Sequence, residues 1–429
     1  MNMKKVIFMI ISAVLTLLYG CEKENGVNYV AVSVIVEYPA DLISPQVVSE
    51  IFEFRNITTG NVTSYDQRDG ILLPAGLYDC SYTAEVKHLF GSDTLTASVQ
   101  GMTRSVQLSP ASSKVTVSSF VLEDKGDFII QEVFYTGTLY PTGKQYNGTG
   151  YVRIYNNTDR VLYADGLAFM ESKFSTTQKY DYTPDLLSSH MTVHAIYVIP
   201  GSGQEHPVAP GESLILCDTG IDHRLVNPNA FDLSHADFEW YDVSSSPSNL
   251  DIDSPTVPNL DKWYCYTNSF FILHNRGFKA WALARIPTDK ETFLAENYYE
   301  YEYTMVLPAG TFPMSQKAYK VPNEWIVDAV NASVASEYVW NVTDASLDRG
   351  YTYCGEIDHD KTRYFKSVRR KLLYKTSDGR CVLKDTNNST VDFNAGCVPS
   401  LIEEQHTAVD ANGTPSVTVT YDGVTPVEE

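Results

Sequence analysis

The sequence predicts a mainly β protein built from two tandem β-sandwiches. Three observations support this class. The 429 residues include 29 Tyr and 18 Phe, and aromatic residues suit the pleated, half-buried surfaces of sheets. Apolar and polar side chains alternate with period two over 78–86, as on a strand with one face in water. A charged stretch at 123–127 then reads as a linker between a shorter and a longer domain.

The N-terminal segment has the layout of an export signal. Lys4 and Lys5 precede an apolar run over 6–18, which is too short to span a bilayer comfortably and leads to Gly20 and Cys21. This arrangement resembles the bacterial lipobox, which implies that residues 1–20 are removed and that Cys21 carries acyl chains. Such chains anchor firmly, because each buried CH₂ contributes about 0.8 kcal/mol. The alternative is a cleaved secretory signal with Cys21 as an ordinary first cysteine.

The segment 21–27 is expected to be a linker to the lipid anchor. Its charged residues Glu22, Lys23 and Glu24 resemble the surface-export tag of Bacteroidota lipoproteins, which implies an outer-membrane protein facing outside. The net charge of −21 repels anionic membrane surfaces, so we expect membrane contact only through lipidated Cys21. The same charge repels phosphate backbones, so nucleic acid is not an expected partner.

Six further cysteines follow Cys21, and an exported protein can oxidise them. Cys80 and Cys217 lie in strand-like runs, where we expect buried thiols that act as small apolar residues. A disulfide is favoured in the last quarter of the chain, which holds Cys354, Cys381 and Cys397. The pairing, which also concerns Cys265, stays open. No C-x-x-C occurs, so a zinc ribbon has no support.

The first predicted domain is a small β-sandwich at 28–124. Alternating or apolar runs at 30–36, 49–55 and 115–122 predict strands. The segment Ile71-Leu72-Leu73-Pro74-Ala75-Gly76-Leu77-Tyr78 resembles the strand entry of transthyretin-like and carboxypeptidase-regulatory-like sandwiches, and an immunoglobulin-like arrangement fits it as well. The face expected to be buried comprises Tyr78, Cys80, Tyr82, Ala84 and Val86.

The second predicted domain spans 127–403, and a polar tail at 404–429 holds one short strand at 416–421. A strand at 128–133 precedes Tyr151-Val152-Arg153-Ile154-Tyr155-Asn156-Asn157-Thr158, and a turn ending at Leu167 follows. This order resembles the lamin-tail domain, which implies a larger immunoglobulin-like sandwich. Further strands are expected at 210–216 and 325–330, with a hairpin that joins 270–275 to 280–283. Long loop insertions are expected at 170–207 and 218–268.

Three later segments carry a second resemblance. They are Ser367-Val368-Arg369-Arg370-Lys371, then Val382-Leu383-Lys384-Asp385-Thr386-Asn387-Asn388-Ser389, then Asp392-Phe393. With the preceding strands, they resemble a family of Bacteroidota lipoproteins with domain of unknown function 4876, over most of 127–400. The resemblance carries no assigned chemistry to any residue of this chain.

The sequence contains no H-E-x-x-H, G-x-S-x-G, Walker or G-x-G-x-x-G motif. We therefore expect no catalytic residues, no cofactor and no metal site. His190 and His194 would meet on a helix, but the β-branched residues around them favour a strand, on which they do not converge. Tyr299, Tyr301 and Tyr303 alternate with glutamates, as on an ordinary strand.

The candidate ligand-binding region is the aromatic stretch 237–266. Its nominated residues are Trp240, Tyr241, Trp263, Tyr264 and Tyr266, which are interleaved with aspartates in a proline-containing loop. Loops on a sandwich commonly carry binding groups, and aromatic rings beside acids stack on sugar faces or hold cationic or peptide ligands. The alternative is a small core beneath a long loop.

These features lead to one main hypothesis and two alternatives. The main one is an outer-membrane surface lipoprotein that acts as a non-catalytic binding or accessory protein of a TonB-dependent nutrient uptake system. Its ligand is not identified, and its expected partners are the membrane and the outer-membrane transporter. The alternatives are a structural or adhesive surface protein without a small ligand, and an enzyme built from scattered carboxylates.

Overall fold

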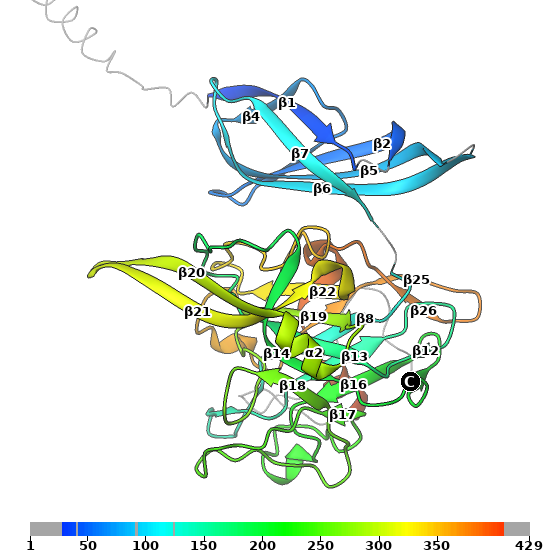
Figure 1. The fold of residues 1–429 in the computed structure, drawn as a ribbon, viewed down its shortest axis with the longest axis vertical. Coiled ribbons are helices and arrows are strands. Elements are labelled where there is room, and N and C mark those ends of the chain that lie inside the picture. Colours follow the sequence, from blue (N-terminus) through cyan, green and yellow to red (C-terminus); the bar gives the residue numbers. More distant parts are fainter. Residues whose placement is uncertain (1–27, 40–41, 91–92, 123–124, 407–429) are drawn as a thin grey trace, which may run out of the picture. The chain divides into compact units, whose positions relative to one another are not determined.

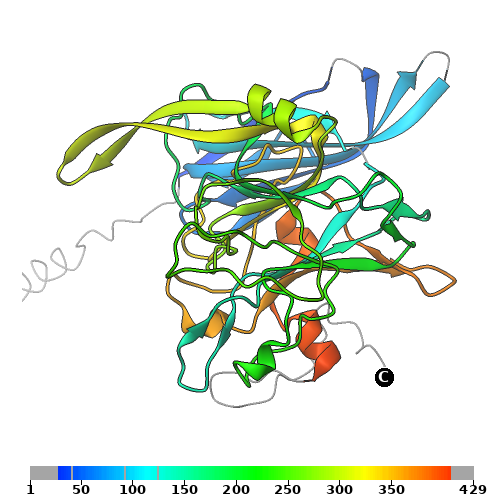
Figure 2. The same ribbon diagram turned by 60° about the horizontal axis from the view of Figure 1, so that its bottom comes forward.

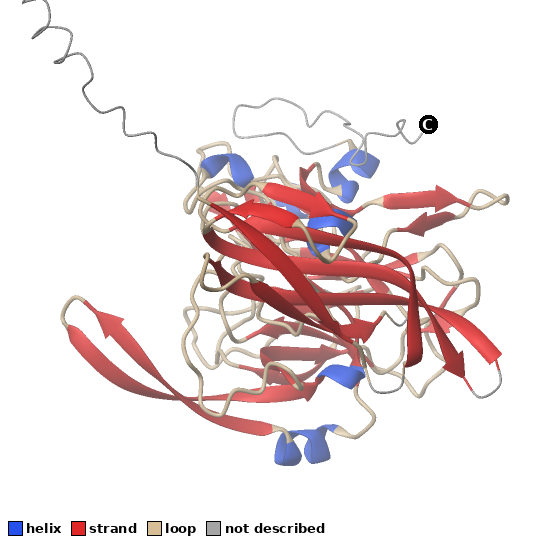
Figure 3. Cartoon of the chain, turned by 90° about the horizontal axis from the view of Figure 1, so that it is seen from above, coloured by secondary structure: helices blue, strands red, loops and turns tan. Residues whose placement is uncertain are grey.

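The computed structural model describes residues 28–39, 42–90, 93–122 and 125–406. The chain divides into two compact units, Met1–Val121 and Leu122–Glu429, and each is built mainly from strands (Figures 1 and 3). This confirms the predicted fold class, and the division lies near the predicted end of the first domain at 124. The signal segment, Cys21 and the tail strand predicted at 416–421 lie outside the described residues. In the described part, no helix is long and apolar enough to cross a membrane.

The first unit is one seven-stranded sheet with the order β3-β2-β5-β6-β7-β1-β4. Its strands are β1 (Tyr29–Glu37), β2 (Ile43–Asn56), β3 (Val62–Tyr65), β4 (Ile71–Pro74), β5 (Gly76–Phe90), β6 (Asp93–Leu108) and β7 (Lys114–Val121). The β1–β7 pair is parallel, and the other pairs are antiparallel. In Figure 1, β1 and β4 lie over β2, β5 and β6 as a second layer.

The core of the first unit lies between these layers. It contains the face predicted to be buried, from Tyr78 to Val86 in β5, whose five side chains are at most 4% exposed. Val32 and Val34 of β1 and Val115 and Val117 of β7 close the core from the other side. The period-two pattern therefore identified the buried face of β5 correctly.

The second unit contains two large sheets. The first has the order β17-β16-β11-β8-β24-β27. Its strands are β8 (Ile129–Phe134), β11 (Tyr151–Tyr155), β16 (Ser213–Cys217), β17 (Phe238–Glu239), β24 (Ser367–Arg370) and β27 (Phe393–Cys397). The second has the order β20-β21-β14-β13-β19-β22-β23, and β18 also pairs with β14. Its strands are β13 (Leu167–Ser172), β14 (His190–Val198), β18 (Asp261–Cys265), β19 (Ala280–Arg285), β20 (Tyr298–Leu307), β21 (Gly310–Pro322), β22 (Ile326–Ser333) and β23 (Thr352–Tyr353).

Short elements complete the second unit. The remaining strands form three pairs: β9 (Thr138–Leu139) with β10 (Gln145–Tyr146), β12 (Leu162–Tyr163) with β15 (Pro207–Val208), and β25 (Leu372–Lys375) with β26 (Cys381–Leu383). The helical segments are η1 (His223–Leu225), α2 (Lys290–Glu296), η2 (Asn323–Trp325), η3 (Lys361–Arg363), α3 (Ser389–Asp392) and α4 (Ser400–Gln405). In Figure 2, α4 and η1 lie at the same end of the second unit.

The core of the second unit lies between its two large sheets. Val133 and Val152 from the first sheet pack in one cluster with Phe169, Leu283 and other residues of the second. The outer face of the second sheet is also covered, because Val193 and Ile196 of β14 pack in another cluster with Phe293 of α2. A strand buried on both faces explains the continuous apolar run of β14.

Two predicted segments differ from the structure. Residues 270–275 form no strand, and the predicted hairpin is therefore wrong: β19 pairs instead with β13 and β22. The apolar pattern of 270–275 arises because Phe271 and Leu273 are loop residues buried in the core. The region 170–207 is more than a loop insertion, since it contains the whole of β14, a central strand.

The favoured disulfide is also not formed. All six cysteines between Cys80 and Cys397 are free thiols, including Cys354, Cys381 and Cys397. Cys80 and Cys217 are fully buried, as expected for small apolar residues. Burial raises the pKa of the Cys80 and Cys354 thiols to about 12, so both are protonated and weakly reactive at neutral pH.

Candidate functional site

The aromatic stretch 237–266 does not form one binding surface. Trp240 follows β17 and is fully buried; its ring stacks on Phe169 at 5.7 Å and meets Phe271 edge to face at 5.9 Å. Its backbone N–H donates to the carbonyl of Cys217, which continues the β16–β17 pairing and directs the ring between the sheets. The prediction that Trp240 anchors a ligand is therefore wrong, and the small-core alternative describes it correctly.

The other four nominated residues lie in different surroundings. Trp263 and Tyr264 of β18 are half-buried against the outer cluster, where their rings lie 5.7 Å from Phe293 and 4.5 Å from Tyr319. Tyr241 is half-buried. Tyr266 is 57% exposed. Whether a loop side chain is buried or exposed depends on the sheet face against which it packs. The local sequence does not determine which face that is.

The acidic side chains of the stretch 237–266 accept hydrogen bonds from nearby backbone N–H groups. Glu239 accepts hydrogen bonds from the N–H groups of Gly220 and Ser254, both at 2.6 Å. Asp242 accepts from the Phe271 N–H at 2.9 Å and from the Tyr197 hydroxyl at 2.8 Å. A loop with little regular structure must satisfy its buried N–H groups with side chains. These carboxylates were predicted as part of a ligand surface, and the structure shows them as internal acceptors.

Tyr266 covers a buried pair formed by His194 and Glu171. Its ring stacks on the imidazole of His194 at 4.3 Å between ring centroids. His194 Nε2 lies 2.7 Å from Glu171 Oε1, and Glu171 Oε2 accepts from the indole N–H of Trp281 at 2.8 Å. Burial lowers the pKa of His194, which keeps the imidazole neutral. Burial disfavours the Glu171 carboxylate, but hydrogen bonding and the nearby charge of Lys279 lower its net pKa.

This pair has the geometry of a carboxylate that orients a neutral imidazole. Glu171 and His194 come from the neighbouring strands β13 and β14, so the sheet fixes their positions. Lys279 lies nearby and donates to the carbonyls of Ser172 and Lys173. Burial lowers the pKa of Lys279 to about 8. Both carboxylate oxygens of Glu171 accept hydrogen bonds, which fits a structural role.

A cleft lies beside the β20–β21 hairpin of the second unit. Its volume is about 420 Å³, within the range of about 300–1,000 Å³ typical of small-ligand pockets. We call it the hairpin cleft, and its lining residues are Asp181, Thr183, Glu302, Tyr303, Thr304, Pro313, Met314 and Ser315. The hairpin itself extends away from the rest of the second unit (Figures 1 and 3).

Backbone pairing holds the two walls of the cleft together. Thr183 and Glu302 exchange two N–H···O bonds of 2.9 Å, so the loop before β14 lies along the edge of β20. The ring of Tyr303 lies 4.6 Å from that of Tyr180 and 5.5 Å from that of Tyr182. The ring of buried Tyr301 meets that of Tyr182 edge to face, with 5.5 Å between the ring centroids. The strand predicted for Tyr299, Tyr301 and Tyr303 is present, but no local pattern predicted the loop that packs beside it.

The chemistry of the cleft is that of a binding site. Tyr303 supplies an aromatic face, and exposed Asp181 and Glu302 supply carboxylates. Aromatic faces stack on apolar sugar faces and attract cations, while carboxylates accept hydrogen bonds from hydroxyl or ammonium groups. Neither Asp181 nor the Glu302 carboxylate forms an ion pair with another described residue, so both remain available to a ligand.

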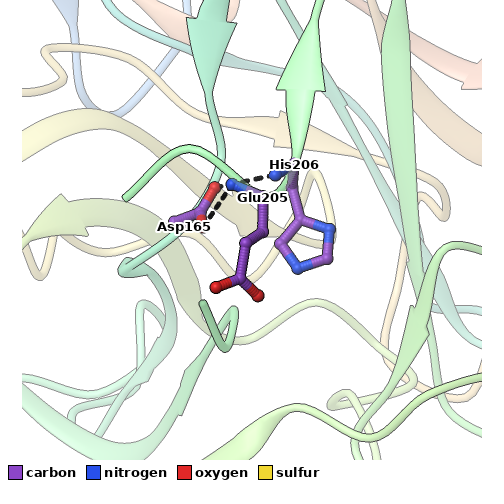
Figure 4. A group of neighbouring side chains, drawn as sticks. All are labelled: Asp165, Glu205 and His206. Carbon is purple, nitrogen blue, oxygen red and sulfur yellow. Dashed lines mark hydrogen bonds between the residues drawn. The ribbon is translucent and has the colours of Figure 1, made fainter. Parts of the chain in front are cut away.

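A third group of side chains has metal-ligating chemistry. Asp165, Glu205 and His206 place one ligand atom each within 4.8 Å of one another (Figure 4). However, the Asp165 carboxylate already accepts from the backbone N–H groups of Gly203, Glu205 and His206 at 2.9–3.1 Å. Burial opposes its charge, but these three bonds lower its net pKa. The group therefore shapes the 200–207 loop without requiring an ion.

The fold and the hairpin cleft define a two-unit β-sandwich protein with a ligand-sized groove on its second unit. Residues 209–400 match the model of the family described as "Protein of unknown function (DUF4876)". This confirms the resemblance carried by the segments between 367 and 393. A crystal structure of a DUF4876 family protein from Bacteroides thetaiotaomicron VPI-5482 is similar in fold, with 21% identity and a TM-score of 0.51. The alignment covers 86% of this chain and 96% of that one. No curated protein matches the chain.

Proposed function

We propose that this chain is a lipid-anchored, non-catalytic binding protein on the outer face of a bacterial outer membrane, where it serves a TonB-dependent nutrient transporter. The hairpin cleft is the observation that carries the binding role. Its volume of about 420 Å³, its tyrosine face and its two unpaired carboxylates suit a ligand rich in hydroxyl or cationic groups. The anchor is acylated Cys21, as the resemblance of the N-terminal segment to a lipobox implies.

The tip of the hairpin supports a protein partner. Residues 303–314 contain no charged side chain, although the whole chain carries a net charge of −21. Val306, Leu307 and Phe312 are 73%, 45% and 40% exposed. Exposed apolar groups gathered on a projecting hairpin, with strand edges open for pairing, are typical of interaction surfaces. We propose that this tip contacts the transporter.

Binding to the cleft is tested with an array of oligosaccharides and peptides. Tyr303→Ala and Glu302→Gln should each weaken binding of any array ligand by about 10- to 100-fold, the usual range for a contact worth 1–3 kcal/mol. Tyr374→Ala is the matched control, since Tyr374 is 53% exposed on the separate β25–β26 pair. Equal affinities in all three variants would place the ligand elsewhere.

The anchor and the partner are tested in cells. Cys21→Ser should move the protein from the membrane to the soluble fraction, and a membrane-bound variant would refute the lipid anchor. Pull-down from intact outer membranes should recover a transporter, and Leu307→Ser should reduce that recovery. Leu225→Ser is the control, because Leu225 is 85% exposed on η1. Recovery of a host or matrix protein instead would favour the adhesive alternative.

A further inference from the structure

The strand β20 lies at the edge of its sheet, and another segment covers only part of its free edge. β20 comes first in the order of the second large sheet, where its strand partner is β21. On the other edge, Thr183 and Glu302 exchange two N–H···O bonds of 2.9 Å. Among the described residues, this bridge is the last backbone contact on that edge before the tip of the hairpin.

Beyond the bridge, the edge of β20 presents backbone groups that are open for pairing. Successive residues of a strand direct their N–H and C=O groups to opposite edges, and a bridge with two exchanged bonds uses both groups of each residue. Because Glu302 uses both of its groups toward Thr183, the groups of Thr304 and Val306 point to the same edge. The intervening residues pair with β21 on the opposite edge, where Tyr303 lies opposite Met314.

The hairpin cleft lies where the covering loop leaves this edge. Its lining includes Thr183 and Glu302 from the bridge, and Asp181 and Thr304 just beyond it. If the antiparallel pairing continued, Asp181 would lie opposite Thr304, but no backbone bond joins these two described residues. The cleft of about 420 Å³ that both residues line therefore takes the place of the next pair in the ladder.

The open part of the edge lacks the usual protection against pairing. Exposed edge strands commonly carry charged side chains or proline, or are covered by another segment. Residues 303–314 contain no charged side chain, and β20 contains no proline. Val306 and Leu307 are exposed near the tip. This part of β20 is therefore suited to pairing with a further strand.

The charge of the cleft indicates what kind of strand fits there. Its lining contains the acids Asp181 and Glu302 and no lysine or arginine. The whole chain has a net charge of −21, which also attracts a cationic partner. A strand with a basic side chain at the inner end of the edge would thus be complementary to the cleft.

We propose that the hairpin cleft binds an extended peptide, which adds a strand to β20 along 304–306 and places a basic side chain beside Asp181 and Glu302. In this mode of recognition, main-chain hydrogen bonds give affinity, and alternate side chains of the added strand give specificity. A sugar would use the ring of Tyr303 but would leave the strand edge unpaired. The inference rests on the proposed function, because it names the class of ligand that the hairpin cleft binds.

The test uses the full-length protein and synthetic peptides chosen from a random library displayed on phage. Thr304→Pro removes an N–H that points to the open edge, without removing a bond to β21, and should weaken peptide binding about 10- to 100-fold. Thr304→Val is the matched control: it keeps the N–H and should bind as the wild type does. The chosen peptides should share a lysine or arginine, and Asp181→Asn should weaken their binding. Peptides without a basic residue would refute the charge complementarity.

N-methylated peptides test the same hydrogen bonds on the wild-type protein, and they decide the question if Thr304→Pro does not fold. Methyl groups on the peptide nitrogens that face β20 should weaken binding about 10- to 100-fold, and these nitrogens should alternate along the peptide. Methyl groups on the nitrogens between them should have little effect. A loss without this alternation, or no loss at all, would refute strand addition.

Other results would also overturn the inference. Equal affinities of Thr304→Pro and Thr304→Val would show that the peptide does not pair with the edge. Binding of oligosaccharides alone, weakened by Tyr303→Ala, would refute the peptide but leave the cleft as the binding site of the proposed function. If neither peptides nor oligosaccharides bind, both proposals fail. A wild-type dimer that Thr304→Pro dissociates would identify a second copy of the chain as the partner of the edge instead.

Discussion

Replacing Trp240 with alanine should destabilise the second unit, because the side chain is part of the core between its sheets. Trp→Ala changes in cores cost about 3–5 kcal/mol through lost burial and the remaining cavity. The indole N–H of Trp240 has no partner among the described residues, so its removal also relieves an unpaired buried donor, worth about 1–3 kcal/mol. The two effects oppose each other, and we expect a net loss of about 2 kcal/mol in the free energy of unfolding. That is a large share of the roughly 5–15 kcal/mol typical of a domain.

The assay is urea unfolding followed by tryptophan fluorescence. All five tryptophans lie in the second unit, so the signal reports on that unit alone, and four remain in the variant. Val243→Ala is the control, since Val243 lies close by in the chain and is 79% exposed, and it should change stability by less than about 0.5 kcal/mol. If Trp240→Ala lowers the free energy of unfolding no more than Val243→Ala does, Trp240 is not part of the core. It would then again be a candidate surface anchor for a ligand.

Two further predictions concern buried charges in the second unit. Arg370 is 2% exposed and donates to Asp328 at 2.6 Å, so Arg370→Met should cost about 3–5 kcal/mol, while Arg224→Ala at an exposed pair should cost less than about 1 kcal/mol. Urea midpoints that are equal for these two variants would contradict the buried pair. Burial lowers the pKa of His274 to about 4, so the unfolded chain binds its proton first, and stability should fall from pH 7 toward pH 4 by on the order of 3 kcal/mol. His274→Asn should flatten this dependence, and an unchanged slope would show that other groups cause it.

Several features of the fold could be predicted from local sequence. The alternation in β5 identified its buried face, since side chains on a strand point to opposite sides whatever the partner strands are. The glutamates between Tyr299, Tyr301 and Tyr303 predicted β20 for the same reason. In these segments a local sequence pattern is sufficient to predict the strand.

Much less of the candidate site could be predicted from the sequence. The hairpin cleft exists because Thr183 pairs with Glu302, and no local pattern reports a contact between segments so far apart in the chain. The apolar pattern of 270–275 predicted a strand, although those residues reach the core as a loop whose Phe271 N–H binds Asp242. The acids of 237–266 indicated a ligand surface because a sequence does not show whether a carboxylate faces solvent or a backbone N–H.

The sequence by itself determined the mainly β class, the division into two domains and the buried face of β5, because these follow from the period of side chains along a strand and from a charged linker. Only the tertiary structure decided that Trp240 lies between the sheets and that Tyr303 lines a cleft. Burial and hydrogen bonding are set by partners distant in the chain. Residues of the same chemical type, such as Trp240 and Trp263, therefore meet different environments that their neighbours in sequence do not distinguish.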